Sequence, residues 1–298
     1  MNQMVEWQQH RGPAVAAANG VDIIECETCG FKHAIPIPTP VELAATYSGQ
    51  PFVSVPDDRE GEWLQNVYRD RYETLEELLP AERRRLLDIG SGAGTFLLCG
   101  QERNWQVRGI EPCAELAAYS RQQGLDVMTG FFDSVTVAEL VLADAVAINE
   151  VLEHIPAPIE FLQLATSLLQ AGGILTVTVA NEFNPLQTAY RQIREVPPWW
   201  LVPPVHVNYF DTRSLPQLLG RLGYDVLHVE ATFPIDMFLL MGEEYLGNLA
   251  LGGQCHERRR TFELNMRAGG QNSVKRALYR KMAEIGLGRE VTVYARKY

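Results

Sequence analysis

The sequence lacks any run of about 18 apolar residues, the length that a membrane-spanning helix needs. Its first residues, Met-Asn-Gln-Met-Val-Glu-Trp, contain neither a basic region nor an apolar core, so no secretory signal peptide is predicted. Cysteine is scarce and odd in number, five in 298 residues. Without a secretory signal, this number favours reduced thiols and a cytoplasmic location.

Positive charge is also in short supply. Lysine and arginine number 26 against 37 acidic residues, which gives a formal net charge of −11 and a pI near 5.1. Such a chain is poorly suited to nonspecific binding of nucleic acid, so no nucleic-acid partner is expected. Hydrophobic residues make up 46% of the chain, ample for a buried core. The length fits one large domain, alone or with a small appendage.

A glycine-rich turn between two apolar segments organises the sequence. Residues 85–89 predict a short buried strand, and the Gly-Ser-Gly-Ala-Gly run at 90–94 lets the backbone turn tightly and approach a ligand. Residues 95–103 predict a helix whose amino end faces that ligand. Residues 107–110 predict the next strand, with Glu111 at its carboxyl end. A carboxylate at this spacing accepts hydrogen bonds from ribose hydroxyls, so we expect an adenosine-type cofactor.

The glycine spacing indicates which cofactor. A dinucleotide fingerprint requires Gly-x-Gly-x-x-Gly, but here Thr95 stands where the last glycine should be. A nicotinamide dehydrogenase would share the strand-helix-strand unit and is therefore kept as a rival. With Asp88 in front, the turn resembles motif I of class I S-adenosylmethionine (SAM)-dependent methyltransferases, Asp/Glu-x-Gly-x-Gly-x-Gly. By that resemblance the turn faces the methionine part of SAM and Glu111 binds its ribose. The alternative is a glycine turn in an ordinary α/β sheet.

A second motif follows the strand predicted at residues 143–148. The run from Asn149 to Pro156, Asn-Glu-Val-Leu-Glu-His-Ile-Pro, resembles the block "EVLEH". This block marks a family that includes ubiquinone-pathway O-methyltransferases and many small-molecule methyltransferases. The resemblance places Asn149 and Glu150 beside the methionine part of SAM. The Asn/Asp-Pro-Pro-Tyr/Phe motif common in methyltransferases of nucleobase amines is absent, which argues against such an acceptor.

The same resemblance places residues 131–133 along the adenine of SAM. Phe131 or Phe132 would contact the base and Asp133 would accept from its amino group; the alternative for the aromatic pair is core packing. The implied SAM-binding set is Asp88, Gly90, Ser91, Gly92, Gly94, Glu111, Phe131, Phe132, Asp133, Asn149 and Glu150.

Two histidines are candidates for a general base, a group that a hydroxyl acceptor requires. They are His154, in the second motif, and His206, in a His-x-Asn-Tyr-Phe element that resembles one found in close relatives. The alternatives are that His154 braces its loop and that His206 only bonds to backbone. For the acceptor we predict contacts from Trp199, Trp200 and Tyr209. The two tryptophans lie in a proline-stiffened loop that suits a wall or lid; the alternative is that they pack a small subdomain.

A basic segment near the carboxyl end contrasts with the acidic chain. From Gln254 onward eleven Lys/Arg face four Asp/Glu, so the local excess is 11 − 4 = +7. Solvated helix faces are the simpler interpretation. The other is a positive patch that recruits an anionic acceptor, such as a nucleotide-linked or phosphorylated sugar.

The amino-terminal residues carry a Cys-x-x-Cys-Gly turn at Cys26 and Cys29, the form of a zinc knuckle. The segment resembles the second half of the zinc ribbon that precedes some sugar and natural-product methyltransferases, with the first half lost. A closed site needs four ligands, and only His33 and His10 lie nearby, so no metal is predicted. The alternative is a hairpin that no longer binds metal. Residues 1–20, Ala-rich, are expected to be poorly ordered.

The resemblance implies an α/β fold of the class I methyltransferase type, a Rossmann-like, mostly parallel seven-stranded sheet with its final strand antiparallel. We expect an amino-terminal appendage at 1–58 and a methyltransferase domain at 59–298, with acceptor-side insertions at 181–213 and 233–288. The expected function is transfer of a methyl group from SAM to a small-molecule acceptor, first of all a hydroxyl of a sugar, glycan precursor or related metabolite. The alternatives are N- or C-methylation of a natural product and a non-catalytic SAM-binding partner protein. The oligomeric state stays open.

Overall fold

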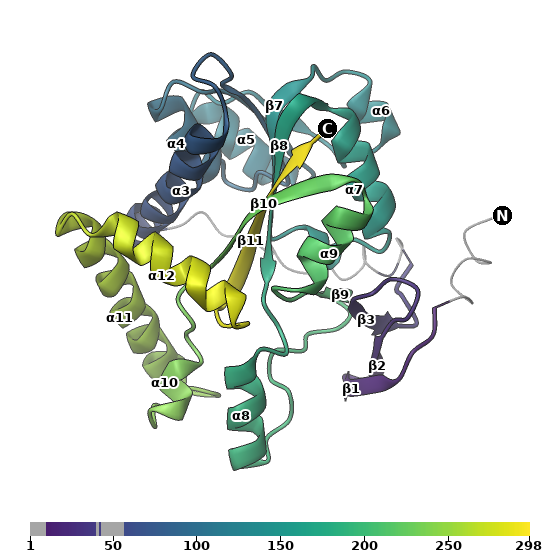
Figure 1. Ribbon diagram of the computed structural model, residues 1–298, viewed down its shortest axis with the longest axis vertical. Coiled ribbons are helices and arrows are strands. Elements are labelled where there is room, and N and C mark those ends of the chain that lie inside the picture. Colours follow the sequence, from purple (N-terminus) through teal and green to yellow (C-terminus); the bar gives the residue numbers. More distant parts are fainter. Residues whose placement is uncertain (1–9, 40–41, 43–56) are drawn as a thin grey trace.

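A seven-stranded sheet forms the centre of the computed structural model, which describes residues 10–39, 42 and 57–298 (Figure 1). Its order is β10-β11-β8-β7-β4-β5-β6, and β11 alone runs antiparallel to its neighbours. This confirms the expected fold and the antiparallel final strand. The strands are β4 (Arg85–Ile89), β5 (Gln106–Glu111), β6 (Val127–Thr129), β7 (Ala143–Asn149), β8 (Leu169–Ala180), β10 (Tyr224–Ala231) and β11 (Glu290–Lys297).

Helices cover both faces of this sheet (Figure 1). On one face, α3 (Asp58–Leu78), α4 (Thr95–Glu102) and α5 (Ala114–Gln122) bury Tyr72, Leu97 and Ala117 against the strands. On the other, α7 (Pro158–Ser167) and α9 (Ser214–Arg221) bury Leu162 and Leu218. Short turns of helix, α6 (Ser134–Val137) and η2 (Leu152–His154), follow β6 and β7. Along the described residues no helix has the length and apolar character to cross a membrane.

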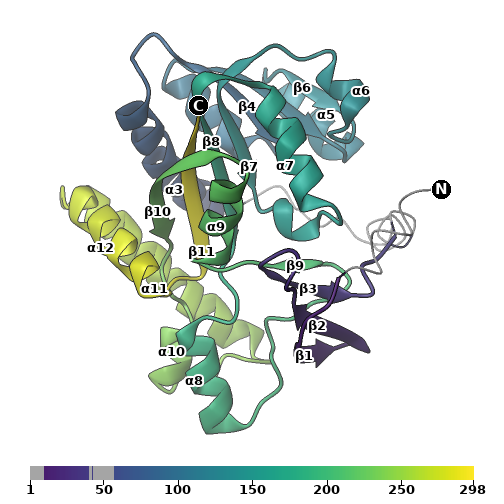
Figure 2. The same ribbon diagram turned by 45° about the vertical axis from the view of Figure 1, so that its right-hand side comes forward.

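Both insertions contain helices. The one after β8 contains α8 (Pro185–Arg194). Asn184 caps it through Leu186 N and Gln187 N, and Pro185 occupies its first turn, a combination that favours helix initiation. The insertion before β11 contains α10 (Met237–Leu240), α11 (Leu249–Ala268) and α12 (Asn272–Glu284). Helix α8 lies beside α10 below the sheet (Figure 2).

A second, four-stranded antiparallel sheet holds the amino-terminal residues (Figure 2). It joins β1 (Ala14–Ala18), β2 (Val21–Glu25) and β3 (Lys32–Ile35) to β9 (Asn208–Tyr209), which comes from far along the chain. The expectation of poor order was therefore wrong for residues 14–18, while residues 1–9 lie outside the described part. Asn19 and Gly20, both left-handed with φ of 52° and 76°, form a tight hairpin turn that pairs β1 with β2.

Candidate active site

The glycine turn lies between β4 and α4, held against the end of β5. Gly90 N and Ser91 N donate to Ile110 O at 2.8 and 3.0 Å. Gly90, Gly92 and Gly94 all have left-handed φ values, 78°, 53° and 80°, a conformation that glycine adopts without strain. A Cβ on Gly90 would also lie 2.4 Å from Val151 Cγ2. The turn therefore needs glycine both for its conformation and for its closeness to the loop after β7.

Glu111 ends β5 and reaches back to this turn. Its Oε2 accepts from Gly92 N and its Oε1 accepts from Cys113 N, each at 2.8 Å. Burial raises the pKa of Glu111, and these two hydrogen bonds oppose the rise. A carboxylate accepts about four hydrogen bonds, so each oxygen keeps capacity for a further donor. A fixed carboxylate with this capacity, next to a turn of bare glycines, fits the ribose of SAM.

The residues after β6 divide between surface and core. Phe131 is 73% exposed, whereas Phe132 is half-buried and packs edge-on against Phe161 with ring centroids 5.2 Å apart. Asp133 Oδ1 caps α6 by accepting from two backbone N–H groups. Phe132 thus packs in the core, as the alternative interpretation expected. The exposed ring of Phe131 suits the flat face of an adenine. The adenine contacts of all three residues stay a prediction.

A buried polar chain joins β4, β7 and α3. Asn149 Nδ2 donates to Asp88 Oδ1 at 3.2 Å, and Arg71 donates to Asn149 Oδ1 at 2.7 Å. Arg71 also faces Glu290 at 3.6 Å. Burial raises the pKa of Asp88 to about 7, although the hydrogen bond from Asn149 and the charge of Arg71 lower it. These contacts fix the carboxyl ends of β4 and β7 relative to the helix that covers them.

Sequence reasoning missed Arg71, which is 5% exposed. A signal was present: Arg71 lies four residues after Val67 and four before Leu75, in the middle of the apolar stripe of the predicted helix. A charged residue in such a stripe is buried only when it finds a partner.

A cavity of about 190 Å³ opens between α3, the end of β7, α11 and the start of β11. Glu150 lines it with a left-handed backbone, φ 54°, which is uncommon for a residue with a side chain. Repulsion from Glu290, followed by burial, raises the pKa of Glu150 to about 7. The residues that line the cavity are Glu60, Trp63, Leu64, Val67, Tyr68, Arg71, Glu150, Arg259 and Glu290.

The loop after β7 brings the two base candidates together. The rings of His154 and His206 meet edge to face with centroids 5.0 Å apart, and His154 Nδ1 lies 2.9 Å from Val205 O. Burial lowers the pKa of His154. Burial, then the charges of His154 and Arg289, lower that of His206 to about 3. Both imidazoles are therefore neutral at pH 7. A carboxylate oxygen of the buried Glu153 lies within 4.8 Å of a ring nitrogen of each histidine.

The three residues expected to contact the acceptor lie elsewhere. Trp200 and Tyr209 are 5% and 1% exposed and fill a core with Ile23 and Ala34 of the small sheet, against which Trp199 packs. None of the three lines the cavity described above. The tryptophans thus pack a small subdomain, as the alternative interpretation expected, and β9 carries Tyr209 into the same small sheet. A role in acceptor binding stays a prediction that this packing does not support.

The basic insertion does not form a free positive patch. Its cations pair with acidic residues of the neighbouring elements, α3 above all. These pairs favour the interpretation as ordinary helix faces over that of a positive patch that recruits an anionic acceptor. The pairs include Arg260–Glu60 (2.6 Å), Arg267–Glu73 (2.9 Å), Lys275–Asp70 (2.6 Å), Arg276–Glu77 (2.7 Å) and Arg280–Glu230 (2.6 Å). The local charge is therefore used to dock α11 and α12 on the rest of the domain.

Residues 61–229 match the family model described as "Methyltransferase domain". The chain is 29% identical over 117 residues to a ubiquinone biosynthesis O-methyltransferase from Xylella fastidiosa (strain 9a5c), covering 37% of this chain and 48% of that protein. A protein of the same name from Caulobacter vibrioides is 34% identical over 112 residues, covering 34% and 43%. The chain thus spans about half the length of the curated relatives it matches.

Among solved structures, a SAM-dependent methyltransferase from Archaeoglobus fulgidus superposes with a TM-score of 0.51. It is 17% identical, and the match covers 80% of this chain and 94% of that one, which supports the fold alone. The family match extends over more than half of the chain and includes the glycine turn, Glu111 and the loop after β7. The chain therefore belongs to the methyltransferase-domain family, with S-adenosylmethionine as its cofactor and the sheet order of a class I methyltransferase fold.

Proposed function

We propose that this protein methylates a hydroxyl group of a small molecule, with sugars, glycan precursors and related metabolites as the first acceptors to test. The observation that carries the proposal is a pair of neutral, half-buried imidazoles, His154 in the loop after β7 and His206 just before β9. A hydroxyl must lose its proton during methylation, and a neutral imidazole accepts one. The similarity to relatives named O-methyltransferases agrees with this choice.

SAM, when bound, supplies a methyl group made electrophilic by its sulfonium. The glycine turn and Glu111 would hold the cofactor at the carboxyl ends of β4 and β5. The remaining task of the chain is to orient the acceptor and take up its proton, for which positioning and general-base catalysis are the main contributions.

Of the two histidines, His154 is the better base. Val205 O accepts from its Nδ1–H, which leaves the lone pair of the ring on Nε2. His206, with a pKa near 3, holds a proton too weakly to be an effective base at neutral pH. We assign His206 to positioning, since its ring supports that of His154 edge to face.

Amine methylation is the second candidate, because the cavity carries carboxylates. Glu150 and Glu290 face each other across its wall, and a cationic amine would relieve the repulsion between them. Glu60 contributes less, since Arg260 and His256 already pair with it. The cavity, about 190 Å³, suits a small acceptor or the reacting end of a larger one in either case.

The test is methyl transfer from labelled SAM to matched panels of hydroxylated and amine acceptors. Replacing His154 with Ala should lower kcat about 100-fold and leave SAM affinity nearly intact, whereas His228→Ala, on β10, is the control. Replacing His206 with Ala should lower kcat by less and shift the pH profile. Full activity of the His154 variant would refute the base assignment. Turnover of amines alone would favour N-methylation, and SAM binding without turnover of either panel would favour a non-catalytic protein.

A further inference from the structure

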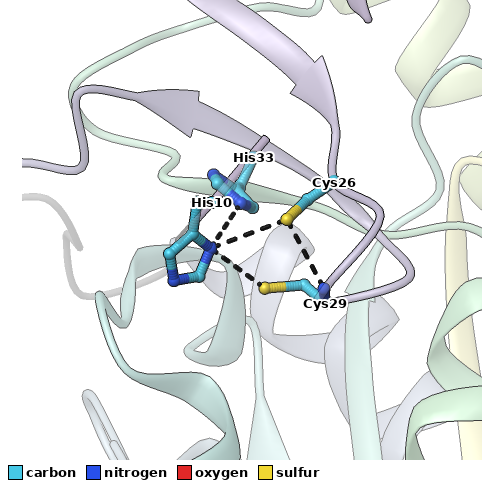
Figure 3. Close-up of side chains that lie close together, drawn as sticks. All are labelled: His10, Cys26, Cys29 and His33. Carbon is cyan, nitrogen blue, oxygen red and sulfur yellow. Dashed lines mark hydrogen bonds between the residues drawn. The ribbon is translucent and has the colours of Figure 1, made fainter. Parts of the chain in front are cut away.

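Four side chains meet at the amino-terminal edge of the small sheet, outside the cofactor site. They are His10, Cys26, Cys29 and His33, and their ligand atoms all lie within 4.8 Å of one another (Figure 3). His10 Nδ1 is 3.6 Å from Cys26 Sγ, 3.3 Å from Cys29 Sγ and 3.1 Å from His33 Nε2. We propose that these residues form a structural zinc site of the Cys₂His₂ type.

The distances agree with tetrahedral coordination. Zinc binds sulfur at about 2.3 Å and imidazole nitrogen at about 2.0 Å, so four ligands around one ion lie about 3.3–3.8 Å apart. The three measured separations, 3.1 to 3.6 Å, lie at or just below this range. Two thiolates and two neutral imidazoles also balance the charge of Zn²⁺, which makes a buried site neutral. Soft sulfur with imidazole selects zinc over magnesium or calcium.

The backbone between the cysteines has the form that such sites require. Gly30, left-handed with φ 73°, donates to Cys26 O at 2.8 Å and closes the turn. Cys29 N donates to Cys26 Sγ at 3.4 Å, so a backbone N–H already stabilises negative charge on this sulfur. Cys26 is 1% and His33 1% exposed, so these side chains are withdrawn from solution reagents. A closed site with four protein ligands and no open position is typical of structural zinc.

The fourth ligand is delivered by a segment built for close approach. Arg11 O and Pro13 O accept from Glu27 N and Glu25 N, each at 3.0 Å, which continues the sheet past β1. A Cβ on Gly12 would lie 1.8 Å from Glu25 O, so this position has room for glycine only. The segment that precedes β1 therefore supplies, through His10, one of the two ligands that a second Cys-x-x-Cys supplies in a full ribbon, and His33 of β3 supplies the other.

A backbone carbonyl fixes the orientation of His33. Ala34 O accepts from His33 Nδ1 at 2.9 Å, which leaves Nε2 as the metal ligand. His33 pairs with Asn208 across β3 and β9, and Asn208 Nδ2 donates to Leu152 O and Ile155 O at 3.0 and 2.7 Å. A zinc ion would thus anchor β3 on β9 and, through Asn208, the loop that carries His154.

Metal analysis of the purified full chain, grown with zinc and without a metal-affinity tag, tests the proposal. We expect about one zinc per chain, falling at least tenfold in Cys26→Ser/Cys29→Ser. Cys255→Ser, a buried thiol outside the cluster, is the matched control and should keep its zinc. His10→Ala keeps the test decisive if the double variant fails to fold, and should bind zinc at least tenfold more weakly.

A second measurement counts the thiolates. Cobalt titrated into metal-free protein should give a tetrahedral spectrum with two sulfur-to-metal charge-transfer contributions, lost in the double cysteine variant. The proposal would be overturned if the protein held well under one zinc per chain and the metal-free protein also failed to bind cobalt. It would also be overturned if the zinc-poor protein contained a Cys26–Cys29 disulfide. Zinc that persists in the double cysteine variant but disappears on replacing His206 would overturn it too, because that result would place the ion at the Glu153-His154-His206 cluster instead.

Discussion

Replacing Asp88 with Asn should remove a pH-dependent penalty from the folded state. Asp88 is 2% exposed, and burial raises its pKa from 3.8 to about 7. Between these values the folded state binds more protons than the unfolded state, so stability falls as pH rises and the penalty is complete above about pH 7. Asn is nearly isosteric, carries no charge, and still offers an oxygen to Asn149.

The size of the effect follows from the shift. A rise from 3.8 to about 7 corresponds to about 4 kcal/mol, because each pKa unit contributes about 1.4 kcal/mol. Roughly 2.5 kcal/mol of this accrues between pH 5 and pH 8. The difference in unfolding free energy between the Asn variant and the wild type should therefore move by about 2.5 kcal/mol in favour of the variant over that range.

Urea unfolding of both proteins without added SAM, at several pH values from 5 to 8, measures this difference. Other buried carboxyl groups also titrate there, but they are common to both proteins and cancel in the comparison. Asp126→Asn, which removes a carboxylate that is 67% exposed, controls for the general effect of one lost charge. A stability difference that stays constant from pH 5 to pH 8 would refute the argument that burial holds a proton on Asp88.

Three further predictions concern the cofactor and the insertion. Glu111→Ala should weaken SAM binding by about 1–3 kcal/mol in calorimetric titration, through loss of charge-assisted hydrogen bonds; unchanged affinity would remove Glu111 from the site. Gly92→Val should abolish detectable SAM binding, since a branched residue is strained at φ 53° and fills the turn, and normal binding would contradict this. Arg267→Met should lower unfolding free energy by about 1–3 kcal/mol in urea, less at high salt, because it removes the pairs with α3; an unchanged midpoint would show that those pairs contribute nothing.

Local pattern was sufficient to predict the sheet and the cofactor turn. Strands β4 and β7 are short, mostly apolar segments followed by glycine or ending in a polar residue, and the turn at Gly90 requires left-handed backbone that glycine supplies. The residues that define a nucleotide-binding unit lie within 27 positions, 85–111, so their relation is visible in the sequence itself.

Features made by residues far apart were not predictable in this way. The partners of Arg267 in α3 lie 194 to 201 positions earlier, so its charge looked unpaired. Trp200 is buried because β9 joins a sheet whose other strands precede α3. His10 and His33 were candidates from the sequence, but only the pairing of β1 with β2 and of β2 with β3 brings them together with both cysteines. The Asn19-Gly20 turn, in contrast, is a local hairpin signal that the Ala-rich composition of β1 concealed.

Strand β11 lies between β8 and β10, although it follows both in the sequence. During synthesis β10 therefore has no place in the sheet until β11 leaves the ribosome, and the edge of β8 stays open for the time needed to translate the α10–α12 insertion. An open edge is where strands of different chains pair. Over the same interval the acidic residues of α3 lack the cations of α11 and α12. Their negative charge would then repel other nascent chains of the same protein. The order of elements along the chain thus makes closure of the sheet a late step, with α3 repelling other chains until β11 is inserted.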